Sequence, residues 1–264
     1  MVPKDMQVVI LCGGEGIRLK SQNDFISKAM VFIDDKPMLW HVMKRYSLFG
    51  HNEFILALGK YGEQIRDYFL NYNLYNNDIE FRMGESGKID YHSLSQEENW
   101  KITLVNTGEE ARTGARLSRC KNYLESDFML SYADCLSNVD LDKLIKLHKS
   151  NKKIAAVTGV MPPFRYGEFI MKGNKVSDFL PVSKLKAESG YVNGGFMVLT
   201  KKIFNYLSSF NECTLENEVF QELIAKNDLG IYKHDDFWQC LDNDREFSYL
   251  KKLCQENKRY WLQK

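Results

Sequence analysis

Residues 7–19 read QVVILCGGEGIRL, an apolar run that passes directly into a glycine-rich segment. The run, Gln7–Cys12, is short and rich in β-branched residues, which is typical of a strand buried on both faces of a parallel sheet. Glycine lets the backbone approach a ligand closely, and the amide groups of such a loop can hold phosphate oxygens. The stretch therefore predicts an α/β sheet whose first strand ends in a phosphate-binding loop.

Strand and helix patterns alternate along the rest of the chain. Residues 36–49 (KPMLWHVMKRYSLF) have apolar side chains near helical spacing, and Pro37 suits the first turn of such a helix. Residues 53–58 (EFILAL) form a second apolar run, and residues 62–72 have a second helical pattern. Further strands are expected at residues 128–133 and 154–160, and further helices at residues 140–150, 214–226 and 244–256. This alternation predicts an α/β fold with a mostly parallel, Rossmann-like sheet.

The alternation of strand and helix patterns is interrupted between residues 78 and 106. Two short strand patterns, at residues 79–83 and 101–105, flank a polar segment there, which indicates a β-ribbon excursion from the sheet, either a lid or a subunit contact. The chain contains no obvious linker or internal repeat, and its length suits one domain with excursions better than two small domains. We therefore expect residues 1–264 to form a single domain, with a C-terminal, mainly helical part at residues 214–264.

Composition and charge argue against several classes of partner and site. The chain has 36 basic and 35 acidic residues, so its net charge of +1 gives no general affinity for nucleic acid or an anionic membrane. No apolar run approaches the ~20 residues that span a bilayer, and the first residues lack the pattern of a signal peptide. The six cysteines form no C-x-x-C pair and have no zinc-type spacing. We expect reduced thiols in a cytoplasmic protein.

Two basic residues follow the glycines closely enough to contact the same ligand. Arg18 comes directly after the loop, and its planar guanidinium suits phosphate oxygens. Lys28 lies ten residues further along the chain. An ordinary glycine turn beside a solvated arginine, and a surface lysine, fit the same residues. The segment is neither a P-loop, since no Gly-Lys-Ser/Thr follows, nor a G-x-G-x-x-G dinucleotide fingerprint.

Two aspartates are candidates for binding Mg²⁺. Asp134 directly follows the apolar run at residues 128–133, and ligands of open α/β sheets gather beyond the carboxyl ends of strands. Magnesium prefers a few carboxylates together with substrate phosphates, so Asp242 could supply a second carboxylate from far along the chain. A turn or helix cap for Asp134 and an ordinary loop position for Asp242 remain alternatives.

Three further glycine segments could bring the backbone close to a ligand. They are Thr107-Gly108, residues 113–116 (TGAR) and residues 193–195 (NGG), and each also fits a β-turn. An asparagine such as Asn193 could hydrogen-bond sugar hydroxyls. The sequence has no Ser-His-Asp or Cys-His arrangement, whereas phosphoryl-type transfer needs mainly positioning and charge neutralisation. The residues present suit transfer of a phosphate-containing group.

Taken in this order, these segments resemble the sugar-phosphate nucleotidyltransferase superfamily, and most closely its glucose-1-phosphate cytidylyltransferases. The similarity extends over roughly residues 7–261, and KPMLWHVMKRYS at residues 36–47 with FWQ-x-x-D at residues 237–242 indicate the cytidylyl branch. The other matching stretches are VVILCGGEGIRL, TLVNTG, TGARL, the strand before Asp134 and YVNGGFMVL. The resemblance implies the nucleotide-diphospho-sugar transferase fold. It also implies Mg²⁺-assisted transfer of a cytidylyl group from CTP to a sugar 1-phosphate or a similar phosphorylated acceptor, in a homo-oligomer.

The same resemblance implies roles for individual residues. Arg18 would hold the triphosphate and neutralise charge in the transition state, and Lys28 would contact the α-phosphate. Asp134 and Asp242 would bind Mg²⁺. The residues expected to contact the nucleotide are Leu11, Gly13, Gly14, Gly16, Thr107 and Arg116. Those expected to contact the acceptor are Asn193 and Lys184, with Lys186 as the alternative to Lys184.

The chain departs from the family pattern near both substrates. Ile17 stands where the family has threonine, and alanine and cysteine flank Asp134 where the family has glycines. Residues 183–185 (Ser-Lys-Leu) occupy the place of the Glu-Lys-Pro acceptor motif. A lost carboxylate removes a hydrogen-bond acceptor for sugar hydroxyls, so we expect an acceptor other than simply glucose 1-phosphate. The alternative is that Lys184 and Glu188 restore the usual contacts through a shifted loop.

Three other functions compete with cytidylyl transfer. The first is the same chemistry with UTP or dTTP, because base contacts made by the backbone cannot be recognised from residue types. The second is a catalytically inactive homologue that binds nucleotide, against which the retained Arg18, Lys28, Asp134 and Asp242 argue. The third, a dinucleotide-binding oxidoreductase, fits the opening strand but lacks the required glycine spacing.

Overall fold

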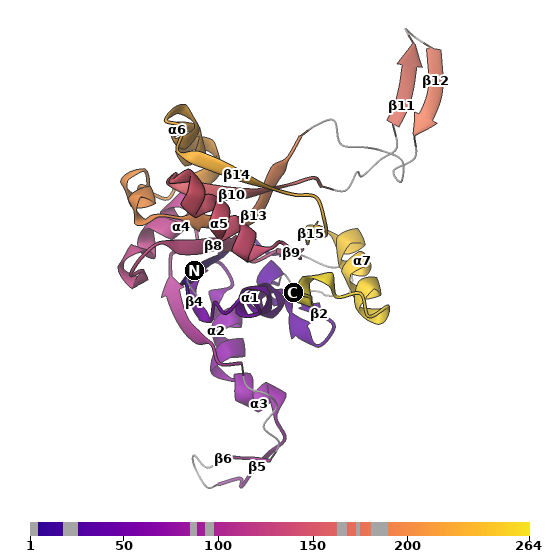
Figure 1. Ribbon diagram of the computed structural model, residues 1–264. Helices are drawn as coiled ribbons and strands as arrows, with labels where there is room; N and C mark the ends of the chain where they lie inside the picture. Colours follow the sequence, from indigo (N-terminus) through magenta and orange to yellow (C-terminus); the bar gives the residue numbers. More distant parts are fainter. Residues whose placement is uncertain are drawn as a thin grey trace.

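A seven-stranded sheet forms the centre of the protein, with helices on both faces (Figure 1). The computed structural model describes residues 5–17, 26–84, 89–92, 98–162, 168–172, 175–180 and 190–264. The strands follow the order β14-β10-β13-β8-β1-β4-β7 across the sheet. Their bounds are β1 Val8–Cys12, β4 Glu53–Leu58, β7 Lys101–Asn106, β8 Phe128–Tyr132, β10 Ala155–Val160, β13 Val192–Leu199 and β14 Leu229–His234. Only β13 runs antiparallel to its neighbours in the sheet, so the predicted mostly parallel α/β fold is confirmed.

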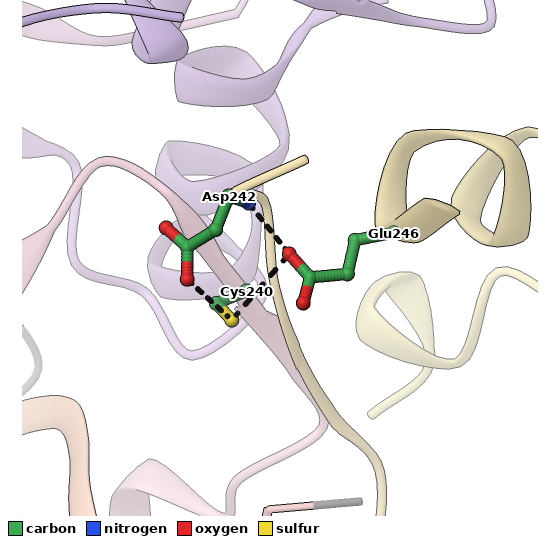
Figure 2. A group of neighbouring side chains, drawn as sticks. All are labelled: Cys240, Asp242 and Glu246. Carbon is green, nitrogen blue, oxygen red and sulfur yellow. Dashed lines mark hydrogen bonds between the residues drawn. The ribbon is translucent and has the colours of Figure 1, made fainter. Parts of the chain in front are cut away.

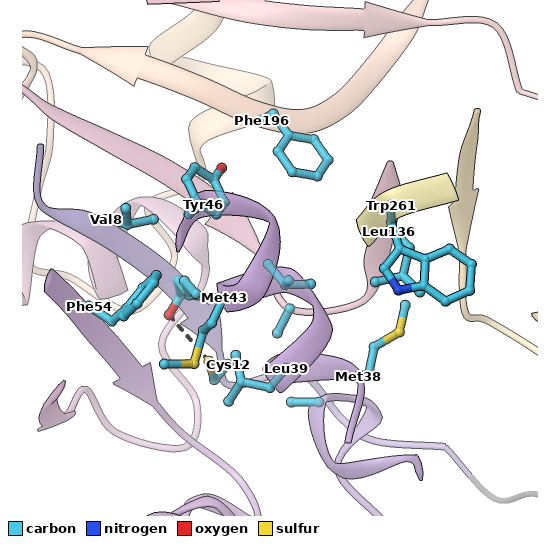
Figure 3. Packing of buried hydrophobic residues seen from close by; sticks show 14 of the residues in the cluster. Val8, Cys12, Met38, Leu39, Met43, Tyr46, Phe54, Leu136, Phe196 and Trp261 are labelled. Carbon is cyan, nitrogen blue, oxygen red and sulfur yellow. Dashed lines mark hydrogen bonds between the residues drawn. The ribbon is translucent and has the colours of Figure 1, made fainter. Parts of the chain in front are cut away.

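The side chains of β1 explain why this strand is apolar without interruption. Val8, Ile10 and Cys12 belong to one buried cluster, which includes α1 (Figure 3), whereas Val9 and Leu11 belong to a second cluster on the other face. Successive side chains of a strand point to opposite faces, so a strand covered on both sides must be apolar at every position. The central position of β1 therefore follows from its sequence.

The helices divide between these two clusters. Residues of α1, α5 and α7 pack in the first cluster, and residues of α4 and α6 pack in the second. The helix bounds are α1 Met38–Ser47, α2 Gly62–Leu70, α3 Tyr72–Asn76, α4 Thr113–Arg119, α5 Leu141–Asn151, α6 Phe220–Ala225 and α7 Asp244–Gln255. A π-helical turn, Leu215–Val219, precedes α6, and short 3₁₀ turns lie at Lys28–Met30, Lys121–Tyr123, Lys201–Asn205 and Tyr260–Leu262. None of the helices in the described ranges has the length and apolar character needed to cross a membrane.

Four two-stranded ribbons accompany the main sheet. They are β2 Phe32–Ile33 with β3 Lys36–Pro37, β5 Ile79–Phe81 with β6 Ile89–Tyr91, β9 Cys135–Ser137 with β15 Trp238–Cys240, and β11 Glu168–Lys172 with β12 Lys175–Leu180. The β5–β6 and β11–β12 ribbons project away from the body of the protein (Figure 1). The β9–β15 ribbon joins the segment after β8 to the segment before α7.

Two segments differ from the expectation in extent. The β5–β6 ribbon ends at Tyr91, and β7, which was expected inside the excursion at residues 78–106, pairs in parallel with β4 as an edge strand of the main sheet. Similarly, residues 214–264 contain β14 and β15 in addition to helices. Both strands pair with partners distant in sequence, which local residue patterns do not reveal.

Candidate active site

A pocket of about 470 Å³ lies beyond the carboxyl ends of β1 and β8. Its walls come from the glycine loop after β1, the 3₁₀ turn that begins at Lys28, residues 109–113 before α4, the end of β8, and the π-helical turn. Six residues predicted from the sequence to serve the nucleotide and its phosphates line this pocket together with one predicted metal ligand: Leu11, Gly13, Gly14, Gly16, Lys28 and Arg116, and Asp134. The position agrees with the general rule that ligands bind beyond the carboxyl ends of strands.

The shape of the glycine loop depends on Gly16. Its φ angle is +81°, and a Cβ atom there would lie 2.6 Å from the carbonyl oxygen of Ile26. Ile17 and Ile26 hold the two sides of the loop together, since the amide of each donates to the carbonyl of the other, at 2.9 and 3.1 Å. Only glycine fits this position without strain.

Arg116 lines the pocket, but the terminal nitrogens of its guanidinium are bound to the protein itself. Nη2 donates to the carbonyl oxygens of Gly13 and Glu109, both at 2.8 Å. Nη1 contacts the carbonyl oxygens of Leu58 at 3.2 Å and Gly108 at 2.7 Å, and Oγ1 of Thr107 at 2.8 Å. The side chain thus joins the glycine loop to the end of β4 and to the segment that follows β7, and the residue is only 4% exposed.

Thr107 is fully buried and does not line the pocket. Its hydroxyl donates to the carbonyl of Leu58 at 2.6 Å and accepts from Arg116. The structure therefore places Thr107 behind the pocket wall, where it supports Arg116.

Lys28 lies between the two aspartates predicted to bind metal. Its Nζ is 2.6 Å from Oδ1 of Asp242 and 3.5 Å from Oδ2 of Asp134. Ala29 and Met30, the buried residues that follow Lys28, anchor its turn in the first apolar cluster. The fold thus brings together three side chains that are distant in sequence: Asp134 follows Lys28 by 106 positions, and Asp242 follows it by 214.

Charge and burial have opposite effects on the pKa values of Lys28 and Asp134. Burial would lower the pKa of Lys28, but its hydrogen bond to Asp242 and the charge of Asp134 raise that pKa overall. Partial burial raises the pKa of the Asp134 carboxyl, and the Lys28 ammonium opposes the rise. The charge of Asp242 also raises the pKa of Asp134, so the Lys28 ammonium is the group that favours the ionised form of Asp134.

A family model described as "Nucleotidyl transferase" matches residues 7–261 of the chain. The chain belongs to this family. A glucose-1-phosphate cytidylyltransferase of Salmonella typhimurium is 36% identical over 97% of this chain and 98% of its own length. A probable glucose-1-phosphate cytidylyltransferase of Bacillus subtilis is 35% identical over 97% of this chain and 99% of its own length.

Solved structures show the same fold. HddC from Yersinia pseudotuberculosis, in complex with GMP-PN, has a TM-score of 0.65 at 22% identity, and the match covers 94% of this chain and 98% of that one. The predicted nucleotide-diphospho-sugar transferase type of fold is therefore confirmed.

Two residues near Asp242 were not predicted from the sequence. Figure 2 shows Cys240 and Glu246 beside this aspartate. Oε2 of Glu246 accepts a hydrogen bond from the Asp242 amide at 2.6 Å, and Sγ of Cys240 donates to Oδ2 of Asp242 at 3.3 Å. Asn243 caps α7 by accepting from the amides of Arg245 and Glu246, both at 3.1 Å. Asparagine followed three residues later by glutamate resembles a capping box, so this pattern could have identified Glu246 in advance.

Asn193, the residue predicted to contact the acceptor, makes two hydrogen bonds within the protein. Its Oδ1 accepts from the amide of Gly195 at 3.0 Å, and its Nδ2 donates to the hydroxyl of Tyr132 at 3.3 Å. Both ends of the amide thus bind the protein, and Asn193 orients Tyr132 at the pocket wall. Arg18 and Lys184, as well as the alternative Lys186, lie outside the described residues.

Proposed function

We propose that the protein transfers the cytidylyl group of CTP to a sugar 1-phosphate, or to a similar phosphorylated acceptor, with formation of a CDP-sugar and pyrophosphate. The similarity to cytidylyltransferases over almost the whole chain supports this reaction. The observation that carries the proposal is the position of Lys28, whose ammonium joins two carboxylates beside a pocket with a glycine-rich wall.

Asp134 and Asp242 form a donor set that fits Mg²⁺. Both are hard oxygen ligands, they come from two segments that meet at the β9–β15 ribbon, and they already share one cation, the Lys28 ammonium. Magnesium typically takes one or two protein carboxylates and completes its shell with water and substrate phosphates. When bound, it would neutralise charge on the triphosphate and on the departing pyrophosphate.

The protein's own residues supply position and charge in this scheme. The amides of the glycine loop would face the nucleotide phosphates, and Gly14 lines the pocket with no atom of the described residues within 4 Å of a Cβ built there. Lys28 would turn from the aspartates to the α-phosphate, and Arg18 would hold the triphosphate. An acceptor phosphate oxygen then attacks the α-phosphorus in line as pyrophosphate leaves, without a covalent enzyme intermediate.

The deciding experiment measures pyrophosphate release with CTP, UTP, dTTP, ATP and GTP against a panel of hexose and heptose 1-phosphates. We expect release with CTP and at least one sugar phosphate, dependent on Mg²⁺. Higher kcat/KM with UTP or dTTP would reassign the base, and no release in any combination would favour an inactive nucleotide-binding homologue. A high efficiency with glucose 1-phosphate would contradict the altered acceptor preference expected from residues 183–185.

We also propose that the protein forms a homo-oligomer through the β5–β6 ribbon. Four apolar side chains of this ribbon are exposed in the single chain: Ile79, Phe81, Ile89 and Tyr91. An exposed apolar patch of this kind often marks an interface. Light scattering after size-exclusion chromatography would test the proposal, and Phe81→Asp should reduce the oligomer mass.

A further inference from the structure

Glu216 places a carboxylate in the wall of the active-site pocket. It belongs to the π-helical turn Leu215–Val219, which is far in sequence from the glycine loop and from Asp134. Single π-helical turns are rare and frequently occur at functional sites. The sequence pattern of residues 214–226 indicated only a helix, so nothing in it singled out this glutamate.

Two protein hydroxyl groups point their hydrogens at this carboxylate. Oγ1 of Thr113 is 2.7 Å from Oε2 of Glu216, and the hydroxyl of Tyr132 contacts Oε1. Each hydroxyl also accepts a hydrogen bond: Thr113 from the amide of Leu215 at 3.0 Å, and Tyr132 from Nδ2 of Asn193 at 3.3 Å. A hydroxyl has a single hydrogen, so in both cases that hydrogen is directed to Glu216.

A separate hydrogen bond determines the orientation of the Asn193 side-chain amide. Its Oδ1 accepts from the amide of Gly195 at 3.0 Å, so its Nδ2 must be the atom that faces Tyr132. The hydrogen bonds therefore all point in the same direction: Asn193 donates to Tyr132, and Tyr132 donates to Glu216. Thr113 donates to the other carboxylate oxygen, so Glu216 is the acceptor in both of its hydrogen bonds to hydroxyl groups.

The Glu216 carboxylate can accept further hydrogen bonds from a ligand. It offers about four lone-pair positions, of which the two hydroxyls use two. Glu216 is half-buried, and no lysine or arginine within the described ranges forms an ion pair with it. A partly desolvated carboxylate without a cation is stabilised by hydrogen-bond donors, and the pocket is where a bound ligand could provide them.

We propose that Glu216 is a specificity-determining residue that accepts hydrogen bonds from the donor groups of a bound substrate. This inference rests on the proposed function and adds to it a residue for substrate recognition. The donors are neutral groups with N–H or O–H bonds, and two sources are chemically equivalent here. One is a hydroxyl of the acceptor sugar, and the other is the amino group of cytosine, which carboxylates also recognise in nucleic acids.

The test compares wild-type protein with Glu216→Gln, which keeps the shape of the side chain but replaces half of its acceptors by an amide donor. The matched control is Glu218→Gln in the same turn. Glu218 is exposed, accepts from the amide of Thr214 at 2.9 Å, and does not line the pocket. We expect Glu216→Gln to lower kcat/KM by ~10-fold or more, because unpaired polar groups in a site discriminate strongly. Glu218→Gln should remain within about twofold of wild type, with a Tm near that of wild type. Glu216→Gln leaves one of the two hydroxyls without its acceptor, so its Tm should fall, and kcat/KM is compared well below the Tm of both variants.

Two comparisons of substrates separate the sources of the donor. If a sugar hydroxyl binds Glu216, the defect of Glu216→Gln should disappear with the deoxy sugar phosphate that lacks this hydroxyl. If the cytosine amino group binds, the defect should shrink or reverse with UTP. A defect equal across all these substrates, or no defect at all, would overturn the inference. Failure of wild-type protein to release pyrophosphate would instead count against the proposed function, so the two failures are distinguishable.

Discussion

Gly59 directly follows β4 and does not line the pocket, yet we expect Gly59→Ala to impair the active site. A Cβ atom at Gly59 would lie 2.2 Å from Nη1 and 2.5 Å from Nη2 of Arg116. A Cβ atom at Gly13 would lie 2.1 Å from Cζ of the same side chain. The guanidinium thus fills the space that a side chain at either glycine would need. A methyl group added at Gly59 must therefore displace it.

The bonds of Arg116 set the size of the effect. Its two terminal nitrogens make five contacts with protein oxygens, and a hydrogen bond to a charged group contributes about 1.5–3 kcal/mol. Loss of two such bonds costs about 3–6 kcal/mol, which in a protein of this size lowers Tm by roughly 6–24 °C. Because Gly13 is one of the partners, a shift of the glycine loop by ~1 Å should also lower kcat/KM by about 100-fold.

Differential scanning calorimetry and the pyrophosphate assay would measure the two effects. Gly14→Ala is the control for stability, since no atom in the described part of the chain lies within 4 Å of a Cβ at Gly14, and its Tm should remain near wild type. In an Arg116→Met background, Gly59→Ala should add much less destabilisation than it causes alone, because the clash with the guanidinium is absent. The reasoning fails if Gly59→Ala leaves both Tm and kcat/KM unchanged, or if its cost is the same in the Arg116→Met background.

Three other perturbations test the site and the fold. Asp134→Asn and Asp242→Asn should each nearly abolish turnover while Tm changes little, and a near-normal rate for Asp242→Asn at saturating Mg²⁺ would exclude Asp242 from the metal site. Arg18→Lys should lower kcat more than it raises KM, because a planar bidentate cation matters most in the transition state; an effect on KM alone would limit Arg18 to ground-state binding. Burial lowers the pKa of His148 below its ordinary value of 6.5. The unfolded chain then binds the proton more readily, and stability falls as pH decreases through about 6.5. The difference in Tm between pH 7.5 and pH 5.5 should be smaller for His148→Leu than for wild type, and an equal difference in both proteins would contradict this reasoning.

The elements with strong local signals were predictable from the sequence. The apolar run at residues 53–58 has the same bounds as β4, and the run at residues 7–12 contains β1. Both strands are covered on two faces, so burial alone determines their residue types. The positions of Lys28 and Asp134 at one pocket followed from the rule for strand ends together with the family resemblance.

Pairing between distant segments was not predictable in the same way. The β9–β15 ribbon, which brings Asp242 to Asp134, joins two three-residue strands without distinctive composition. Glu216 reaches the pocket through a π-helical turn that has no sequence signature of its own. The sequence could assign Arg116 to the site but could not predict its hydrogen bonds. Its five acceptors, four of them main-chain carbonyls, come from the end of β4, the glycine loop and the segment after β7.

The glycine loop shows how such a motif can serve the protein as well as its ligand. Three glycines of the loop were expected to line the nucleotide, but the structure gives each a different constraint. Gly16 has a positive φ angle and abuts the carbonyl of Ile26, and Gly13 leaves the space that the guanidinium of Arg116 fills. Of these three glycines, only Gly14 has no atom of the described residues beside its backbone. Two of the three glycines therefore fix the shape of the loop, and the close approach of a phosphate that we propose is a requirement at Gly14.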